Sequence, residues 1–431
     1  MSSDDPQPRL ARRLGTTDAV LLGLGSMVGA GVYAVFGPAA RAAGSGLLVG
    51  LVIAALIAFC NATASAQLAA AYPTSGGTYV YGRERLGPWW GFVAGWGFVI
   101  GKTASCAAMA LTVATYALPG PWWAQRLLAV AVVIGLMSLN YRGVTKTAAL
   151  TRLLVAVSLV VLTAVVGSIA IRLSGPAQVA SDGLDHWGGL YGILQAAGLL
   201  FFALAGYARI ATMGEEVREP RRTIPRAIPI ALCITVVLYL VVGLAALAAA
   251  GPARLASATA PLAEAVRSVG ADALVPVVRI GAAIGASGAL LALIAGVGRT
   301  TLAMARHRDL PGWLAAVHPR YRVPHHAELA LGVIVSALVL VSDLRGVIGF
   351  SSFGVLVYYA IANAAAYTQS AADRRWPRAL QILGLGGCIA LVITLPWTSL
   401  LAGCLIFAAG LAGRRIVIAG RVRHERTAPP G

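Results

Sequence analysis

Residues 23–40 read GLGSMVGAGVYAVFGPAA, an apolar stretch that carries glycine at Gly23, Gly25, Gly29 and Gly31. The G-x-G-x-x-x-G spacing is similar to dinucleotide-binding loops, in which backbone amides at a helix start hold a pyrophosphate. The same glycines also fit a helix that is interrupted inside a membrane. The composition of the whole chain decides between these interpretations.

The chain is too apolar to build a water-soluble surface. Of its 431 residues, 58% are hydrophobic and only 12% are charged, and the mean hydropathy is +0.79. A membrane-spanning helix needs about 20 mostly apolar residues. The sequence predicts twelve such spans, at residues 17–39, 45–70, 88–117, 124–140, 147–172, 189–209, 225–250, 273–305, 326–342, 346–369, 378–395 and 397–418. The nucleotide-loop interpretation therefore lacks the preceding strand and the soluble α/β unit that it needs.

The apolar runs are continuous and do not alternate with polar residues, which excludes a transmembrane β-barrel and predicts an all-α membrane protein. The polar N-terminal segment is long and no small-residue cleavage site follows it. We therefore expect an uncleaved first span rather than a signal peptide.

The net charge of +18 would suggest a nucleic-acid partner in a soluble protein. Here most lysines and arginines fall in alternate loops, as expected for cytoplasmic loops of a membrane protein. This pattern predicts a multi-pass plasma-membrane protein with both termini in the cytoplasm. We therefore expect the chain to lie in the lipid bilayer and to have no nucleic-acid partner.

The cysteines and histidines do not form a recognisable site. The five cysteines lie in apolar spans without paired spacing, so we expect no disulfide, no disulfide-linked partner subunit and no zinc. The six histidines lie in loops, away from the span centres. Without a catalytic triad, a Walker motif or a metal-ligand set, the sequence predicts no enzyme activity and no cofactor.

Two spans have glycine near the middle. Span 1 contains the stretch quoted above, and span 6 lies within LLFFALAGYARIATMGEEVREP, residues 199–220, with Gly206 near its centre. Spans 1 and 6 begin two successive sets of five and enter the membrane from opposite sides. Interrupted helices at matching positions of inverted repeats are typical of midplane binding sites in transporters. The alternative is a small-residue packing face, since Gly25 and Gly29 also have the G-x-x-x-G spacing.

Four stretches resemble the bacterial amino acid permeases of the amino acid-polyamine-organocation superfamily. They are GLGSMVGAGVYAVFG (23–37), AAAYPTSGGTYVYGRERLGPWWGFVAGWGFVIGK (69–102), FFALAGYARIATMGEEVREPRRTIPRAI (201–228) and GRTTLAMARHRDLPGWLAAVHPRYRVP (298–324). The resemblance implies a LeuT-like fold of two inverted five-helix repeats plus two C-terminal helices, with spans 1 and 6 broken. The expected divisions are a cytoplasmic segment 1–16, repeats 17–172 and 173–369, helices 11 and 12 within 370–418, and a cytoplasmic tail 419–431.

The resemblance also implies transport of an amino acid by alternating access, coupled to protons or in exchange for another amino acid. The alternatives are a polyamine or organocation transporter and, less favoured, a solute-gated channel or transport-like receptor. The amides of Gly29, Ala30 and Gly31 would hold the substrate carboxylate, which agrees with the partial positive charge at a half-helix N-terminus. The resemblance assigns the substrate amine to carbonyl groups at Met27, Phe202 and Ala205.

The chain departs from the family pattern at two places. Ala208 occupies a position beside the site that is often acidic in relatives, which weakens the case for a cationic substrate. Ser158 replaces a span-5 lysine of proton-coupled relatives. Ser158 together with Ser287 offers hydroxyl ligands for sodium, although small serines in helix packing are the commoner case.

Lys102 lies within span 3, flanked by apolar residues. An ammonium group at membrane depth is costly and usually marks a pathway. We expect Lys102 to contact the substrate carboxylate or to couple proton and substrate movement, against the alternative of a lysine that reaches the interface.

The resemblance suggests an inner gate in which Glu215 and Glu216 pair with Arg83 or Arg85. A solvated cytoplasmic face is the simpler interpretation of these charges. For Arg209 the two interpretations are a gating role and a side chain that reaches the membrane interface.

Overall fold

Long apolar runs form helices through almost all of the computed structural model, which describes residues 14–73, 76–142, 148–173, 187–213 and 216–427. Within these ranges there is no β-strand, and only two isolated β-bridges occur. Helices satisfy their own backbone hydrogen bonds, which a spanning segment must do where no water is present. The predicted all-α class is therefore confirmed.

The first part of the chain, up to the second glycine-interrupted span, contains short and long helices. They are α1 (Thr16–Met27), α2 (Gly31–Ala34), α3 (Phe36–Ala43), α4 (Leu47–Ala71), α5 (Thr78–Leu86), α6 (Pro88–Ala117), α7 (Trp122–Tyr141), α8 (Ala148–Leu173), α9 (Gly189–Leu204), the 3-10 helix η1 (Ala205–Tyr207) and α10 (Ala208–Ala211).

The second part continues in the same way to the C-terminal region. Its helices are α11 (Pro220–Ser257), α12 (Pro261–Ser268), η2 (Asp272–Leu274), α13 (Val275–Arg306), η3 (Gly312–Ala315), α14 (His325–Val341), α15 (Leu344–Tyr367), α16 (Arg378–Thr394) and α17 (Trp397–Thr427).

Each of the twelve predicted spans coincides with a helix or a broken helix. Ten of the resulting segments are long and apolar enough to cross a membrane, and α14 and α16 are shorter apolar helices. The fold is thus a multi-pass membrane bundle. The exact number of spans and their division into inverted repeats stay predictions.

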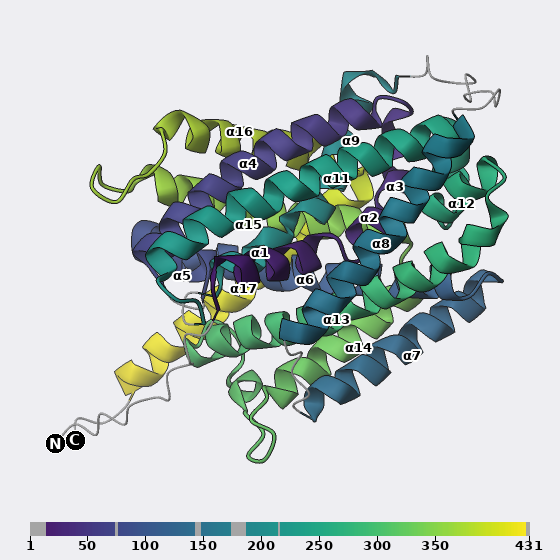
Figure 1. The fold of residues 1–431 in the computed structure, drawn as a ribbon. Helices are drawn as coiled ribbons and strands as arrows, with labels where there is room; N and C mark the ends of the chain where they lie inside the picture. Colours follow the sequence, from purple (N-terminus) through teal and green to yellow (C-terminus); the bar gives the residue numbers. More distant parts are fainter. Residues whose placement is uncertain (1–13, 74–75, 143–147, 174–186, 214–215, 428–431) are drawn as a thin grey trace.

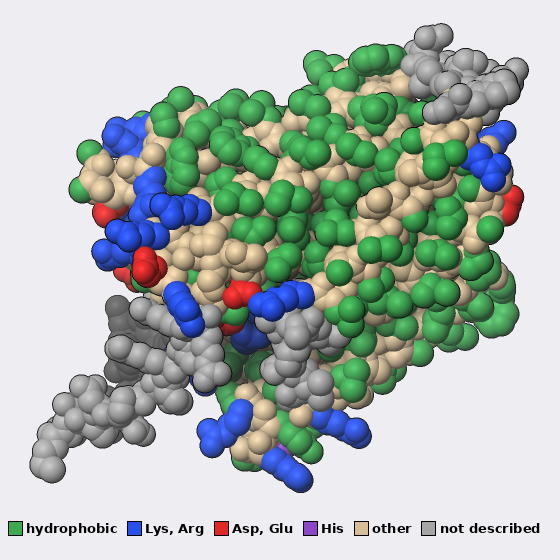
Figure 2. All heavy atoms as spheres, viewed as in Figure 1, with side chains coloured by type: hydrophobic (Ala, Val, Ile, Leu, Met, Phe, Trp, Pro, Cys, Tyr) green, Lys and Arg blue, Asp and Glu red, His purple; other side chains and the backbone are tan. Residues whose placement is uncertain are grey.

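The long helices lie side by side along one direction (Figure 1), with α6 near the centre. α6 packs against α13 and α15, while α4 packs against α9 and α11. Most of α6 is buried, whereas α7 and α17 are largely exposed. On the face that Figure 2 shows, apolar side chains form a broad band, as expected for helices that face lipid.

Arginines gather at one end of the bundle, where α5 and the last turns of α17 also lie (Figures 1 and 2). We call this the basic end. It includes the start of α1, α5, the start of α11 and the segment that follows α13.

Candidate functional site

The first glycine-rich span is interrupted where the sequence predicts it. α1 ends at Met27 and α2 begins at Gly31, so Val28, Gly29 and Ala30 separate two helical pieces. All the residues from Met27 to Gly31 are buried. A Cβ on Gly29 would lie 2.5 Å from the Cβ of Ala289 in α13, so only glycine fits here without a shift of α13.

The second glycine-containing span changes helix type at its centre. α9 ends at Leu204, η1 covers Ala205–Tyr207, and α10 begins at Ala208. Phe202, Ala205 and Ala208 are all buried. The tighter 3-10 geometry alters the i→i−4 hydrogen-bond ladder at this point, which is a common feature of functional hinges.

The two interruptions contact each other directly. A Cβ on Gly206 would lie 2.6 Å from the carbonyl oxygen of Ser26, and a Cβ on Gly31 would lie 3.0 Å from the Cα of Ala203. Both obstacles are backbone atoms, which cannot move aside as a side chain can. The tertiary structure therefore brings together the two broken segments, including most of the residues predicted to bind substrate.

Two buried tyrosines reach the carbonyl groups at this junction. The hydroxyl of Tyr239 in α11 donates to the Met27 carbonyl at 2.9 Å, and the hydroxyl of Tyr359 in α15 donates to the Ala205 carbonyl at 3.2 Å. Both carbonyls are groups that the sequence resemblance assigns to the substrate amine. Neither tyrosine is predictable from the sequence, because an aromatic residue inside an apolar span gives no sign of its distant acceptor.

Lys102 lies at the middle of α6 and is 7% exposed. Next to it, the Cβ of an alanine at Gly101 would lie 3.0 Å from the Ser351 carbonyl, and the Ser105 and Ser351 hydroxyls are 2.7 Å apart. This part of α6 therefore packs against α15. Within the described ranges no ion pair of Lys102 is found. The ammonium group is thus buried in the bundle without a carboxylate partner in those ranges.

Ser158 in α8 faces the interruption of the first span. A Cβ on Gly285 in α13 would lie 3.0 Å from the Ser158 hydroxyl and 3.7 Å from the Gly29 carbonyl. Ser287, its suggested partner, is half-buried two residues farther along α13. The structure therefore places Ser158 beside the interruption. No contact of Ser287 with the interruption is observed among the described residues. Among the described residues there is no cluster of three metal-ligating side chains.

The predicted gate residues have other partners than the sequence suggests. Arg83 pairs with Asp309 at 3.4 Å, and Arg85 donates to the hydroxyl and the carbonyl of Thr368. Glu216 lies 3.9 Å from Arg299. Arg209 is half-buried in α10. Glu215 lies outside the described residues.

Asp309 is the centre of a buried charge cluster at the basic end. Its carboxylate lies 2.9 Å from Arg414 of α17 and accepts a hydrogen bond from Tyr79 of α5 at 2.8 Å. Arg414 also donates to the Pro88 carbonyl at 2.7 Å and lies over the ring of Trp89. The Asp309 and Arg414 side chains are only 5% and 6% exposed.

This cluster joins α5, α6 and α17 to the segment that follows α13. Burial and the hydrogen bond to Asp309 raise the pKa of Tyr79, so its hydroxyl stays protonated and remains a donor. The pairing of Asp309 with Arg414 is not predictable from the sequence, because they are 105 positions apart and each resembles an ordinary loop or interface charge. Only the packing of α17 against α6 shows that they are partners.

The chain is similar to known transporters over nearly its whole length. Residues 14–413 match the amino acid permease family. An uncharacterized transporter of Mycobacterium tuberculosis is 59% identical over 422 residues, which cover 97% of this chain and 95% of the relative. A branched-chain amino acid permease of Bacillus subtilis is 25% identical over 91% of this chain and 90% of its own length.

A chloroplastic cationic amino acid transporter of Arabidopsis thaliana is 29% identical over 90% of this chain and 71% of its own length. These relatives and the family match agree with the helical bundle described above, and they indicate a transporter rather than an enzyme. The chain belongs to the amino acid permease family of the amino acid-polyamine-organocation superfamily.

Proposed function

We propose that the chain is a secondary active transporter that carries amino acids across the plasma membrane by alternating access, coupled to protons or in exchange for a second amino acid. The observation that carries this proposal is the buried junction of the two interrupted spans, where Gly31 and Gly206 pack against backbone atoms of the opposite segment. Irregular backbone at membrane depth is tolerated where it lines a binding site.

The junction offers both kinds of partner that an amino acid head group needs. The amides of Gly29, Ala30 and Gly31 precede the helical piece α2–α3 and present partial positive charge to a carboxylate. The carbonyls of Met27 and Ala205 each accept a tyrosine hydroxyl and have a second lone pair for an ammonium group. The hydroxyls of Tyr239 and Tyr359 would hold these carbonyls in a fixed orientation.

Phe202 and Ala208 complete the predicted pocket with apolar surface, which favours a substrate with an uncharged side chain over a polyamine. Backbone groups would select the head group, and these two side chains would contact the variable part of the substrate. Such a division suits a family whose relatives are described as carriers of both branched-chain and cationic amino acids.

Lys102 is the coupling residue in this proposal. Its ammonium group is buried away from water, and no ion pair in the described ranges compensates for that loss. Gain or loss of a proton there is therefore sensitive to changes in the surrounding packing. Proton binding there would change the charge of the bundle interior during the cycle. A sodium site at Ser158 and Ser287 is the less favoured alternative, because only Ser158 faces the interruption.

Alternating access requires that the basic end open and close. We place this end in the cytoplasm, with twelve spans in two inverted repeats of five and two added helices. The Asp309 cluster ties α5 and α17 to the segment that follows α13, and it would hold the bundle closed on the cytoplasmic side. Opening would separate Arg83 and Tyr79 from Asp309.

The proposal is tested with purified protein in proteoliposomes. Thermal stabilisation is first measured with each of the twenty amino acids and common polyamines, because a ligand that binds only the native state stabilises it. Uptake and counterflow of the best ligand are then measured. Saturable uptake with counterflow of an amino acid is expected. A response to polyamines only would overturn the substrate class, and single-channel currents without counterflow would overturn the carrier mechanism.

A matched pair of variants links transport to the junction. Gly31→Val places a side chain against Ala203 and should abolish ligand stabilisation. Gly135→Val in α7 meets open space and should leave it unchanged. Equal stabilisation of both variants by the ligand would place the site elsewhere.

A further inference from the structure

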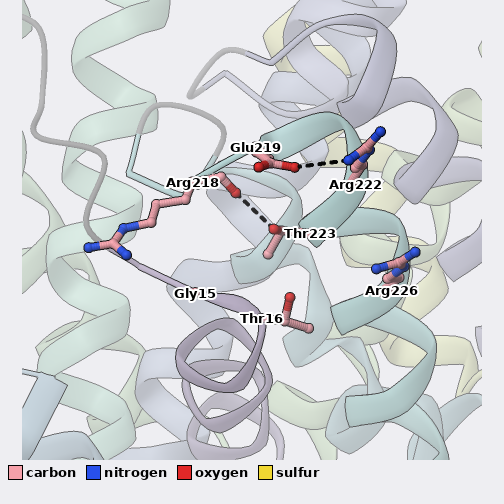
Figure 3. Close-up of a pocket in the computed structure, with 7 residues that line it drawn as sticks. All are labelled: Gly15, Thr16, Arg218, Glu219, Arg222, Thr223 and Arg226. Carbon is pink, nitrogen blue, oxygen red and sulfur yellow. Dashed lines mark hydrogen bonds and ion pairs between the residues drawn. The ribbon is translucent and has the colours of Figure 1, made fainter.

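A basic pocket of about 290 Å³ lies at the basic end, where α1 begins beside α11 (Figure 3). Its lining residues come from the start of α1 and from the first turns of α11 with the residues just before them: Gly15, Thr16, Arg218, Glu219, Arg222, Thr223 and Arg226. In the view of Figure 3, Arg218 lies on one side of Thr16 while Arg222 and Arg226 lie on the other. None of these residues belongs to the junction or to the Asp309 cluster.

The backbone around this pocket is held in place. Leu14 and Val217 form a parallel bridge, in which Leu14 N donates to Glu216 O at 3.1 Å and Arg218 N donates to Leu14 O at 2.8 Å. The Thr223 hydroxyl donates to the Arg218 carbonyl at 2.8 Å. The start of α1 and the start of α11 are thus fixed relative to each other, and the pocket between them has a defined shape.

The charges of the lining favour an anion. The described lining contains three arginines and one carboxylate, and that carboxylate, Glu219, lies 3.5 Å from Arg222 with both side chains largely exposed. Arginine is well suited to bidentate contacts with phosphate oxygens. Thr16 is the first residue of the twelve-residue helix α1, and the amides of a first helical turn lack acceptors within the helix. Asp18 in this turn accepts a hydrogen bond from the Gly15 amide at 3.2 Å and pairs with Arg152, so the preference for an anion rests on the lining arginines.

An apolar stripe continues from the two α11 arginines toward the bilayer. Residues 230, 234, 237, 241 and 244 follow Arg222 and Arg226 at steps of three or four, so they lie on the same face of the helix. These positions are Ile230, Ile234, Val237, Val241 and Leu244, and each side chain is between 43% and 60% exposed. A ligand in the pocket therefore has an exposed apolar surface directly beside it.

We propose that this pocket binds the phosphate of an anionic phospholipid, with the acyl chains lying along the apolar stripe of α11. The basic lining would bind the phosphate of the headgroup, and the apolar stripe would contact the acyl chains. A free phosphate has no chains and would leave the stripe unused. Basic pockets between helices at the cytoplasmic membrane surface suit anionic headgroups. The lipid would join the start of α1 to α11, next to the helix that carries the first interruption. This binding site does not depend on which substrate the protein carries.

The test compares lipids added to the purified full-length protein in a neutral detergent. Dioleoylphosphatidylglycerol is expected to bind and to raise the unfolding temperature more than dioleoylphosphatidylcholine, which has the same chains. Binding is read by native mass spectrometry and by thermal unfolding. The double variant Arg222→Gln/Arg226→Gln should weaken phosphatidylglycerol binding about tenfold or more, given roughly 1 kcal/mol for each basic residue near an anionic surface.

Three further variants make the test specific to the pocket. Arg221→Gln removes an exposed arginine of the same helix that does not line the pocket, and it should leave binding unchanged. Glu219→Gln removes the only lining carboxylate and should strengthen binding. Arg222→Lys/Arg226→Lys keeps the charge and should retain most of the binding, which separates lost binding from a folding defect.

Two results would overturn the proposal. One is equal weakening by Arg221→Gln and by the double glutamine variant, since general surface charge would then explain the binding. The other is full stabilisation by inorganic phosphate or glycerol 3-phosphate alone, which would identify a site for a free phosphate.

Discussion

The junction of the two interrupted spans and the Asp309 cluster are both buried, yet different forces hold them together. At the junction, neutral tyrosine hydroxyls donate to carbonyls at Met27 and Ala205. In the cluster, ionised side chains meet at 2.9 Å and 3.4 Å around one carboxylate. The junction lies inside the bundle and the cluster lies at the basic end.

This difference follows from where water is available. A charge in the apolar interior loses its hydration, whereas the end of a bundle is closer to water and to polar loops. The neutral hydrogen bonds at the junction are each worth about 1 kcal/mol, so breaking one costs little. Removing one partner of an ionic contact in the cluster is costly, because the other partner is then left as a buried, unpaired charge.

The largest effect is expected at the cluster. Arg414→Met leaves the Asp309 carboxylate buried with only Arg83 and Tyr79, and it should lower the free energy of unfolding by about 3 kcal/mol. Unfolding by denaturant in mixed micelles measures this change. Arg415→Met, at the exposed neighbouring position, should cost about 0.5 kcal/mol or less.

Adding Asp309→Asn to Arg414→Met should restore part of the lost stability, because the unpaired charge is then removed. Equal effects of Arg414→Met and Arg415→Met would show that the ionic cluster contributes no more than an exposed charge.

The second effect concerns the close packing of the junction. Gly206→Ala places a Cβ 2.6 Å from the Ser26 carbonyl, and the forced shift should cost about 1–3 kcal/mol of unfolding free energy. Gly135→Ala in α7 meets nothing within 4 Å and should stabilise the helix by up to about 1 kcal/mol. Thermal unfolding of both variants measures these changes. If Gly206→Ala left the stability unchanged, the two segments would have to separate easily.

Lys102 is the exception in the neutral interior, and its replacement tests why the charge is kept. Lys102→Met should leave the fold intact while it lowers uptake roughly tenfold, equivalent to about 1.4 kcal/mol, and flattens the dependence of uptake on pH. Lys102→Arg serves as the variant that keeps a charge but does not release its proton. If Lys102→Met took up substrate at the same rate and with the same pH profile as the unmodified protein, the coupling role would be rejected.

The smallest effect is expected for a single neutral contact at the junction. Tyr359→Phe removes the hydroxyl that donates to Ala205 and should cost about 1 kcal/mol in unfolding free energy. Tyr191→Phe, at an exposed position in α9, should cost much less. If Tyr359→Phe proved as costly as Arg414→Met, the contrast between neutral and ionic contacts would not hold.

Much of the fold is predictable from the sequence because the bilayer imposes a simple local rule. Runs of apolar residues must be helices, so the positions of all the long helices follow from composition along the chain. The interruption near Gly29 is predicted from the clustered glycines of span 1 together with the family resemblance, since glycine alone does not interrupt α6 or α13. The partners of Arg83 and Glu216 were not predictable, because pairing depends on which loops meet in space.

The sequence by itself determined that this chain is a helical membrane protein, where its helices lie and which two of them are interrupted. Only the tertiary structure decided that Gly31 packs against Ala203 and Gly206 against Ser26, that Tyr239 and Tyr359 donate to the carbonyls of Met27 and Ala205, and that Arg414 pairs with Asp309. The physical reason is the range of the interactions. Helix formation and hydropathy act within one turn or one span, whereas hydroxyl, carbonyl and ionic contacts join atoms more than a hundred residues apart.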